Sequence, residues 1–211
     1  ESFFMNMNFS KPVNDFLKRT FDLLVSFFAI IFLLPFFIIV SVLIKLDSKG
    51  PIIFKQVRIG KNEKSFEILK FRTMVVDAEK LGKQITVGND NRVTKSGSFL
   101  RKYKLDELPQ LFNVLKGEMS FVGPRPEVPK YTKLYTDDQK KVFEVRPGIT
   151  DYASIKYRNE NEILGNAKNP EKTYIEEVMQ DKIKINLEYM EHRSIFEDLK
   201  IICLTILKII K

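Results

Sequence analysis

The longest apolar run of the chain lies near its N-terminus. From Leu23 to Ile44 there are 22 consecutive residues without a charge, rich in Phe, Ile, Leu and Val. As a helix this run would be about 33 Å long, at about 1.5 Å per residue, which is enough to cross the apolar part of a bilayer. The pattern predicts a membrane helix over residues 20–46. A buried core helix is the alternative, but it would need a larger soluble protein around it.

The charges on both sides of this run do not support a single crossing. Basic residues precede and follow it: Lys11, Lys18, Arg19, Lys45, Lys49, Lys55 and Arg58. Because basic flanks favour the cytoplasmic side, both ends are expected on the same side of the membrane. Pro35 would break the helix near its middle, where Ser26 and Ser41 could satisfy backbone groups that the break frees. We favour a re-entrant helix over a straight span, although proline is also tolerated in spanning helices.

After a turn signal at residues 47–51 the pattern becomes polar and mixed, and a soluble domain is expected over residues 47–193. Ile52–Val57 and Phe66–Phe71 carry β-branched and aromatic residues around a Gly-Lys-Asn turn, which predicts a short β-hairpin. A helix through residues 77–81 and a polar loop over residues 88–94 are expected next. We interpret the basic rim of the hairpin as a solvated face or as a contact for anionic lipid head groups. The rim consists of Lys55, Arg58, Lys64, Lys70 and Arg72.

Helical spacing of apolar residues predicts three further helices. One runs from Pro109 to Lys116, and a second from Pro170 to about residue 189 with Asn169 as its cap. Ser194 begins a capping-box sequence that opens the last helix, residues 194–211, whose apolar residues gather on one broad side. This pattern predicts an interfacial helix, with a core helix as the alternative.

The expected fold class is therefore α+β and membrane-associated. An N-terminal segment, residues 1–19, precedes a Pro-kinked re-entrant helix. A small, mostly helical domain with a short β-hairpin follows, and a C-terminal interfacial helix ends the chain.

Composition and charge narrow the kind of partner. Lys and Arg outnumber Asp and Glu by 35 to 27, a net charge of +8, which favours an anionic partner. One cysteine, Cys203, excludes an internal disulfide and a Cys-based zinc site, and one histidine, His192, argues against a Ser-His-Asp triad. The sequence lacks the glycine-rich phosphate loop of P-loop nucleotidases. The basic residues form no recognised nucleic-acid motif, so no nucleic-acid partner is expected.

Two adjacent carboxylates, Asp106 and Glu107, stand just before Pro109 and the apolar pattern of a helix. This placement predicts that both lie at the positive end of a helix dipole. The plain interpretation makes Asp106 an N-cap and Glu107 a first-turn acid. In a basic domain held at a membrane, a second interpretation is chemistry on a phosphorylated substrate. One carboxylate would attack phosphorus as a covalent nucleophile and the other would hold Mg²⁺.

Two arginines beside prolines are candidate phosphate contacts. Arg125 lies between two prolines, which restrict the backbone on both sides and suit bidentate capture of a phosphate. Arg146 repeats this arrangement beside a Pro-Gly turn. A rigid connector with surface arginines is the alternative. A membrane-anchored scaffold protein whose basic face recruits an anionic partner also remains open.

Between about Lys18 and Arg158 the chain carries a series of ordered motifs. They are the Pro-containing apolar helix, Lys70-Phe71-Arg72-Thr73-Met74, Leu100-Arg101, Leu105-Asp106-Glu107-Leu108-Pro109-Gln110, Asn113-Val114-Leu115-Lys116-Gly117, Met119-Ser120, Val122-Gly123-Pro124-Arg125-Pro126 and Arg146-Pro147-Gly148-Ile149-Thr150. With these motifs the chain resembles the bacterial sugar transferases, monotopic phosphoglycosyl transferases that initiate glycoconjugate assembly on polyprenyl phosphate. The family's re-entrant helix supports the topology inferred above.

The resemblance implies a two-step exchange. Asp106 would attack the β-phosphate of a UDP-sugar, release UMP and hold the phosphosugar covalently, and polyprenyl (undecaprenyl) phosphate would then take it. By motif position Asp106 and Glu107 are the catalytic residues and Glu107 is the Mg²⁺ ligand. The expected substrate-binding residues are Arg101, Arg125 and Arg146. The product would be a polyprenyl-diphosphate-sugar, the first membrane intermediate of a glycan, O-antigen, capsule or glycoprotein.

The resemblance also implies a location and partners. Residues 47–193 would form the catalytic domain at the cytoplasmic face of a bacterial inner membrane, in contact with membrane lipids and acting before downstream glycosyltransferases of the same pathway. With one apolar run, the chain matches the small form of the family, a catalytic core without appended modules. It departs from many relatives, which carry Gly-Trp-Ala where Asp151-Tyr152-Ala153 stands here, and this leaves the sugar open.

Overall fold

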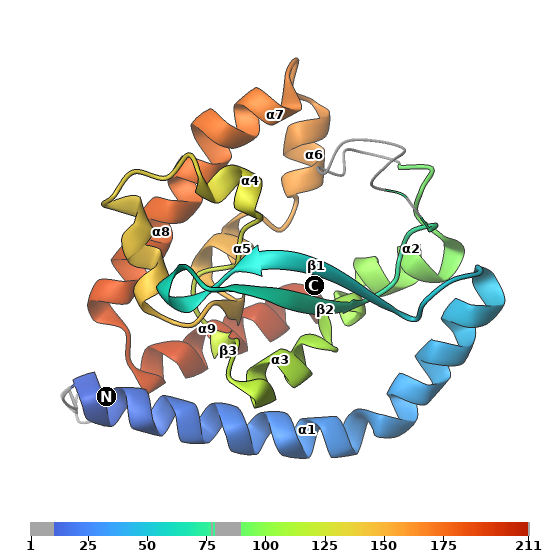
Figure 1. Ribbon diagram of the computed structural model, residues 1–211, viewed down its shortest axis with the longest axis horizontal. Helices are drawn as coiled ribbons and strands as arrows, with labels where there is room; N and C mark the ends of the chain where they lie inside the picture. The colour runs from blue at the N-terminus through green and yellow to red at the C-terminus, as the bar shows by residue number, and fades with distance from the viewer. Residues whose placement is uncertain (1–10, 77, 79–89, 211) are drawn as a thin grey trace.

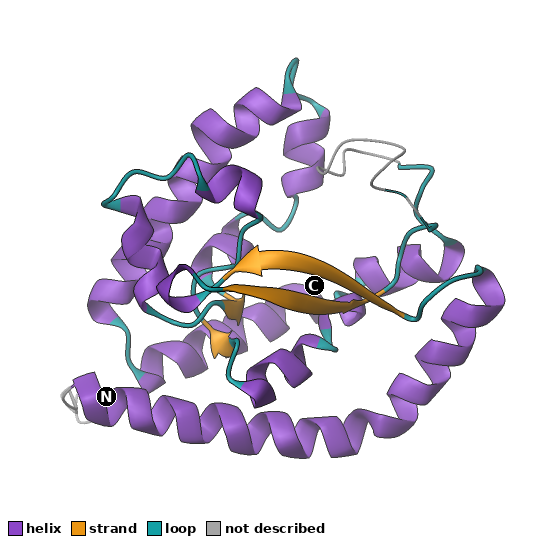
Figure 2. Cartoon of the chain, viewed as in Figure 1, coloured by secondary structure: helices purple, strands orange, loops and turns teal. Residues whose placement is uncertain are grey.

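The computed structural model describes residues 11–76, 78 and 90–210. Helices make up most of the described chain, and its strands form two small two-stranded sheets (Figure 2). The long helix α1 (Lys11–Asp47) runs along one edge of the molecule and changes direction in its C-terminal part (Figure 1). The mixture of helices and strands around one long apolar helix confirms the α+β class.

Helix α1 exposes most of its apolar surface. Within the described residues it is the one helix long and apolar enough to cross a membrane by length and composition, and few of its apolar residues are buried. Phe32 is 83% exposed and Leu46 is 80% exposed. Water solvates so much contiguous apolar surface poorly, whereas lipid accommodates it. The helix therefore indicates membrane association.

The inner face of α1 packs against the soluble part. Phe37, Val40 and Ile44 are buried in one cluster with Phe71 and Leu111. The rings of Phe37 and Phe71 meet edge to face at 5.7 Å between centroids, an arrangement that adds to the gain from burying their area. This contact joins the second half of the apolar helix to the elements that carry the acidic pair.

The predicted hairpin is confirmed. Strands β1 (Ile53–Ile59) and β2 (Ser65–Phe71) pair antiparallel in a register that sets Ile53 opposite Phe71. The turn η1 (Lys61–Glu63) joins them, and Asn62 adopts the left-handed conformation with φ of 55°. Asparagine tolerates this conformation better than most residues. The hairpin crosses the middle of the molecule between α1 and the α7–α8 side (Figure 1).

The basic rim of the hairpin is not uniformly solvated, which corrects the sequence interpretation. Arg72 is buried and donates to the carbonyls of Ser48 at 2.6 Å and Lys49 at 3.0 Å, just beyond the end of α1. Arg58 pairs with Glu127 at 3.3 Å. Lys70, described below, also has a specific acidic partner. Spacing alone marks these residues as a basic face, because their partners lie far away in the sequence.

The second sheet is a parallel pair that the sequence did not predict. Strands β3 (Ser120–Val122) and β4 (Gly148–Thr150) pair with Ser120 opposite Gly148. A Cβ on Gly148 would lie 2.1 Å from the backbone nitrogen of Gly123, and a Cβ on Gly123 would lie 2.4 Å from the carbonyl oxygen of Arg146. Only glycine allows this approach of two backbones. The two Pro- and Gly-containing motifs therefore meet side by side.

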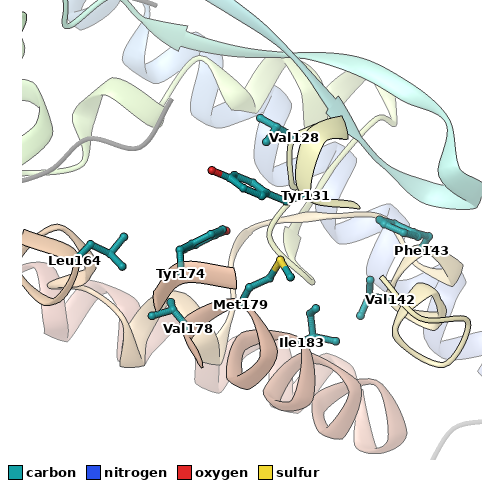
Figure 3. Packing of buried hydrophobic residues seen from close by; sticks show 9 residues of the cluster. All are labelled: Val128, Tyr131, Val142, Phe143, Leu164, Tyr174, Val178, Met179 and Ile183. Carbon is teal, nitrogen blue, oxygen red and sulfur yellow. The ribbon is translucent and has the colours of Figure 1, made fainter. Parts of the chain in front are cut away.

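Short helices and turns build the remainder. The helices are α2 (Lys95–Lys102), α3 (Gln110–Lys116), α4 (Pro129–Thr132), α5 (Tyr152–Lys156), α6 (Glu160–Gly165), α7 (Pro170–Thr173), α8 (Met179–His192) and α9 (Ile195–Ile210). Three further turns are η2 (Leu105–Glu107), η3 (Gln139–Glu144) and the π-helical segment η4 (Tyr174–Val178). A core of apolar side chains from α4, η3, α6, η4 and α8 lies on the side away from α1 (Figure 3).

In the C-terminal third of the chain, the helix caps are the residues that the sequence predicted. The Asn169 side chain accepts from the backbone N–H of Lys172 at 3.2 Å, and Ser194 Oγ accepts from that of Glu197 at 3.1 Å. Both predicted caps are confirmed. The predicted helix after Pro170 is interrupted by η4 and continues to His192.

The last helix combines the two roles that the sequence left open. In α9 Ile201 is fully buried, while Phe196, Ile206 and Leu207 are 42%, 51% and 57% exposed. One side therefore packs on the domain and the other presents apolar surface. That surface fits an interfacial position, which stays a prediction.

One predicted helix lies almost entirely outside the described residues, and the start of another differs from the structure. The helix expected through residues 77–81 falls, except for Ala78, outside the described residues, and a helix that the sequence did not predict, α2, begins at Lys95 behind a Thr94 cap. Helix α3 begins at Gln110 with Pro109 as its N-cap residue. The acidic pair therefore lies in the separate turn η2, and Asp106 is not the cap of α3.

Candidate active site

The turn η2 places the two acidic residues side by side. Lys104 precedes it in the left-handed conformation, with φ of 57°, which redirects the chain after α2. A left-handed non-glycine residue is uncommon and often marks a functional site. Asp106 and Glu107 are both buried, at 8% exposure each. Burying two neighbouring carboxylates is costly unless cations compensate them.

Cations surround Glu107. Lys70 Nζ on β2 donates to Glu107 Oε1 at 2.8 Å, and the Arg125 guanidinium binds both carboxylate oxygens, with 3.2 Å between Nη1 and Oε2. Burial alone would raise the pKa of Glu107, but Arg125 and Lys70 outweigh burial and hold that pKa well below its ordinary value. Glu107 in turn raises the pKa of Arg125. Glu107 is therefore an ionised anchor for two cations.

The second sheet positions Arg125. Its backbone N–H donates to Asp151 Oδ2 at 3.0 Å, and its Nη1 lies 3.4 Å from the carbonyl oxygen of Ile149 on β4. Asp151 is almost fully buried and also caps α5 through the Ser154 N–H. The restricted Pro-Arg-Pro backbone and these two contacts fix the direction of the guanidinium. Asp151 is thus a structural partner of Arg125 that sequence reasoning missed.

Asp106 is in a different state from Glu107. Its Oδ1 has no hydrogen-bond partner among the described residues, although it is buried. Burial raises the pKa of Asp106, the Lys70 charge opposes this, and the Glu107 charge adds to the rise. The Arg101 charge also acts on this carboxylate. A more basic carboxylate with a free oxygen is the better nucleophile of the two.

The predicted site residues do not all meet. Asp106, Glu107, Arg101 and Arg125 belong to one electrostatic cluster, in which Arg101 Nε also donates to Thr73 Oγ1 at 2.8 Å. Arg146 lies elsewhere: its Nε donates to the Gly117 carbonyl at 2.8 Å, beyond the C-terminus of α3. Pro35 lies within α1. The substrate contacts of these residues stay predictions.

Lys70 was not assigned a role from the sequence. It appeared only in the basic rim and in the Lys70–Met74 motif, and strand alternation cannot say which acid it meets. Pairing with β1 and packing against α3 turn its ammonium toward Glu107. The one sequence signal for a role of Lys70 in the site was its place in the Lys70–Met74 motif, near the end of a predicted strand.

A cavity of about 500 Å³ opens beside this cluster. Glu107 and Arg125 line it at one part, and residues of α5, α8 and the end of α9 line it elsewhere. Asp106 does not line it, whereas its neighbour Glu107 does. This volume is within the range of small-molecule sites in proteins.

The carboxylate oxygens of the site suit a magnesium ion that takes some of its ligands from the protein and the others from a substrate. Among the described residues no group of three His, Cys, Asp or Glu side chains forms a complete metal site. Mg²⁺ often takes only one or two carboxylates and completes its shell with substrate phosphates and water. The Glu107 carboxylate, which lines the cavity where substrate phosphates would lie, fits such a site.

Paired buried carboxylates and fixed cations lie beside a cavity in a molecule with a long apolar helix, an arrangement that suits chemistry on an anionic substrate at a membrane. Residues 13–211 match the family described as bacterial sugar transferase. The chain therefore belongs to the bacterial sugar transferases, which confirms the resemblance found in its motifs.

Individual relatives agree with this assignment. An uncharacterized sugar transferase of Bacillus subtilis, EpsL, is 39% identical over 92% of this chain and 87% of its own length. The UDP-N-acetylgalactosamine-undecaprenyl-phosphate N-acetylgalactosaminephosphotransferase of Aeromonas hydrophila is 38% identical over 92% of this chain and 44% of its own. The UDP-glucose:undecaprenyl-phosphate glucose-1-phosphate transferase of Escherichia coli is 38% identical over 93% of this chain and 40% of its own length. The chain thus spans less than half the length of these two transferases.

Proposed function

We propose that this protein transfers a sugar-1-phosphate from a UDP-sugar to undecaprenyl phosphate, releasing UMP. The observation that carries the proposal is the difference between the two carboxylates. Glu107 is paired to Arg125 and Lys70, while one oxygen of Asp106 has no partner in the described part of the chain. The two relatives with named substrates act on UDP-sugars and undecaprenyl phosphate. The product would enter assembly of a surface glycan or glycoprotein, where downstream glycosyltransferases extend it.

The reaction takes place at one phosphorus atom. An oxygen of Asp106 forms a bond to the β-phosphorus as the bond from that phosphorus to the bridging oxygen breaks, and UMP leaves with the electron pair. An oxygen of undecaprenyl phosphate then attacks the same phosphorus, and the Asp106 carboxylate leaves. Asp106 is regenerated and a diphosphate bond joins lipid and sugar, so neither step needs an oxidant or a reductant.

The surrounding residues stabilise charge and fix geometry. Arg125 lines the cavity and is held by Glu107 and Asp151, so it meets phosphate oxygens at little further cost in entropy. Arg101 and Lys70 add positive charge on the side of Asp106. When bound, Mg²⁺ would neutralise the diphosphate and favour UMP as leaving group. Glu107 would hold it.

The function is tested by incubating the detergent-purified protein with a panel of UDP-sugars, undecaprenyl phosphate and Mg²⁺. UMP release is expected with at least one donor, and EDTA should abolish it because phosphate oxygens would lose their divalent counter-ion. A panel that covers hexoses and N-acetylhexosamines and gives no UMP would contradict the proposal. Full activity in the presence of EDTA would contradict only the assignment of magnesium and would leave the proposed reaction standing.

We further propose that α1 is re-entrant, with both ends at the cytoplasmic face of the inner membrane. The change of direction of α1 (Figure 1), the internal Pro35 and the basic residues on both sides support this topology. Contacts of both ends with the soluble part also support it. Near one end Asp22 Oδ1 accepts from the Phe121 N–H at 3.1 Å, and near the other Asp47 Oδ2 accepts from the Ser96 N–H at 2.8 Å.

Single cysteines test this topology. In a Cys203→Ser background, Val13→Cys and Lys49→Cys should both react with an impermeant thiol reagent from the cytoplasmic side of oriented vesicles, because both ends lie on that side. Cysteine at Asp137, on the exposed surface of the soluble part, is the control for cytoplasmic labelling. Labelling of positions 13 and 49 from opposite sides would establish a straight span instead.

A further inference from the structure

Two unpartnered polar groups lie in the cavity away from the carboxylate pair. Asn186 on α8 is 6% exposed, lines the cavity, and its Oδ1 has no hydrogen-bond partner in the described part of the chain. Ser154 on α5 also lines the cavity, and its buried Oγ has no partner there either. Buried polar groups are nearly always satisfied, so such exceptions require an explanation. Neither residue takes part in the reaction described above.

The fold connects these groups to Arg125. The backbone of Arg125 donates to Asp151, and Asp151 caps the helix that carries Ser154. Helix α5 packs against α8, where Met179, Ile183 and Asn186 lie on one face and line the same cavity. A ligand whose phosphates meet Arg125 can therefore extend within one cavity to Asn186.

The chemistry of the carboxamide selects the ligand group. An asparagine side chain presents an acceptor oxygen and a donor NH₂ side by side. The complement is a rigid edge with an N–H next to a C=O on the same side, which is the imide edge of uracil. The acetamido group of an N-acetyl sugar does not match, because its N–H and C=O point in opposite directions.

We propose that Asn186, together with Ser154 of the same cavity, is the uracil-recognition site of the donor cavity. This inference rests on the proposed UDP-sugar activity and identifies the residues that recognise the uracil base of the donor. Asn186 Oδ1 accepts from uracil N3–H while its amide donates to a ring carbonyl, and the Ser154 hydroxyl is available to the second carbonyl. Arg125 then binds the diphosphate, which places the β-phosphorus toward the part of the cavity that Glu107 lines.

The test measures binding of UDP by isothermal titration calorimetry, in detergent with Mg²⁺. In the unmodified protein, 3-methyl-UDP is expected to bind about 10–100-fold more weakly than UDP, because methylation removes the N3–H donor. Asn186→Ala should weaken UDP binding by a similar factor and abolish the difference between the two ligands. Asn166→Ala is the matched control, since Asn166 is exposed and does not line the cavity. It should leave both affinities unchanged.

Three outcomes overturn the inference. One is equal affinity of the unmodified protein for UDP and 3-methyl-UDP, which needs no variant and so does not depend on whether Asn186→Ala folds. Another is unchanged UDP binding by a folded Asn186→Ala protein. The third is a loss seen only for UDP-N-acetylhexosamines and not for UDP-glucose, which would assign Asn186 to the sugar. UMP release by the unmodified protein is measured separately, so the proposed function can stand while this inference fails.

Discussion

Asp106→Asn is expected to lower UMP release by at least about 10⁴-fold, the scale on which loss of a covalent nucleophile acts. The amide is isosteric and neutral, so it can occupy the same buried place but cannot attack phosphorus. Mass spectrometry of the intact unmodified protein, incubated with donor and without acceptor, should show an increase equal to one phosphosugar. The same measurement on Asp106→Asn should show no adduct.

Stability separates this effect from misfolding. One oxygen of Asp106 has no partner among the residues that the structure describes, and burial raises the pKa of this carboxyl, so a neutral side chain is tolerated there. Asp106→Asn should therefore melt at a temperature equal to or above that of the unmodified protein. Asp137→Asn, on a fully exposed side chain, is the matched control and should keep both activity and adduct. An adduct of equal yield in Asp106→Asn would show that another residue is the nucleophile.

Glu107→Gln is expected to destabilise the fold as well as abolish activity. The change leaves the half-buried Lys70 and Arg125 without their common anion. Breaking a fully buried ion pair on one side costs about 3–5 kcal/mol, and the partial exposure of these two cations reduces the expected loss to about 1–3 kcal/mol. Urea unfolding in detergent at neutral pH measures this loss. Glu188→Gln, an exposed glutamate on α8, is the matched control and should change the free energy of unfolding by less than about 0.5 kcal/mol.

The pH dependence of this loss has a definite sign. Because the folded pKa of Glu107 is depressed, its contribution to stability is complete above the unfolded pKa of about 4.3 and is lost as pH falls through the folded pKa. The difference between the unmodified protein and Glu107→Gln should thus be constant from about pH 6 to 8 and shrink below about pH 4. A difference that stayed constant into acid would exclude the ion pairs as its cause.

Local signals in the sequence predicted several elements well. The hairpin, the Asn169 and Ser194 caps and the extent of α9 follow from turn residues, capping side chains and periodicity, all of which act within a few residues. The acidic pair was also found from its position before a proline. The plain interpretation of Asp106 as a helix cap is wrong, because the turn that redirects the chain at Lys104 inserts η2 before α3.

Long-range pairing decided the rest of the site. Lys70 and Glu107 are 37 residues apart, and Arg125 and Glu107 are 18 apart, so neither ion pair has a local signal. The parallel pair β3–β4 brings the two Pro-Gly motifs together, yet it turns Arg125 toward Glu107 and leaves Arg146 at the end of α3. Two arginines in similar local settings therefore have different surroundings.

The sequence by itself determined the apolar helix, the fold class and, through its ordered motifs, the family, because each depends on residue type and short spacing. Only the tertiary structure gave Asp106 and Glu107 different hydrogen-bond and ion-pair partners. In the sequence they are equal neighbours, and their states differ because cations from β2 and from the end of β3 converge on one carboxylate and leave an oxygen of the other without a partner. Burial magnifies that difference, since a low-dielectric surrounding strengthens each pairing and penalises each unpaired charge.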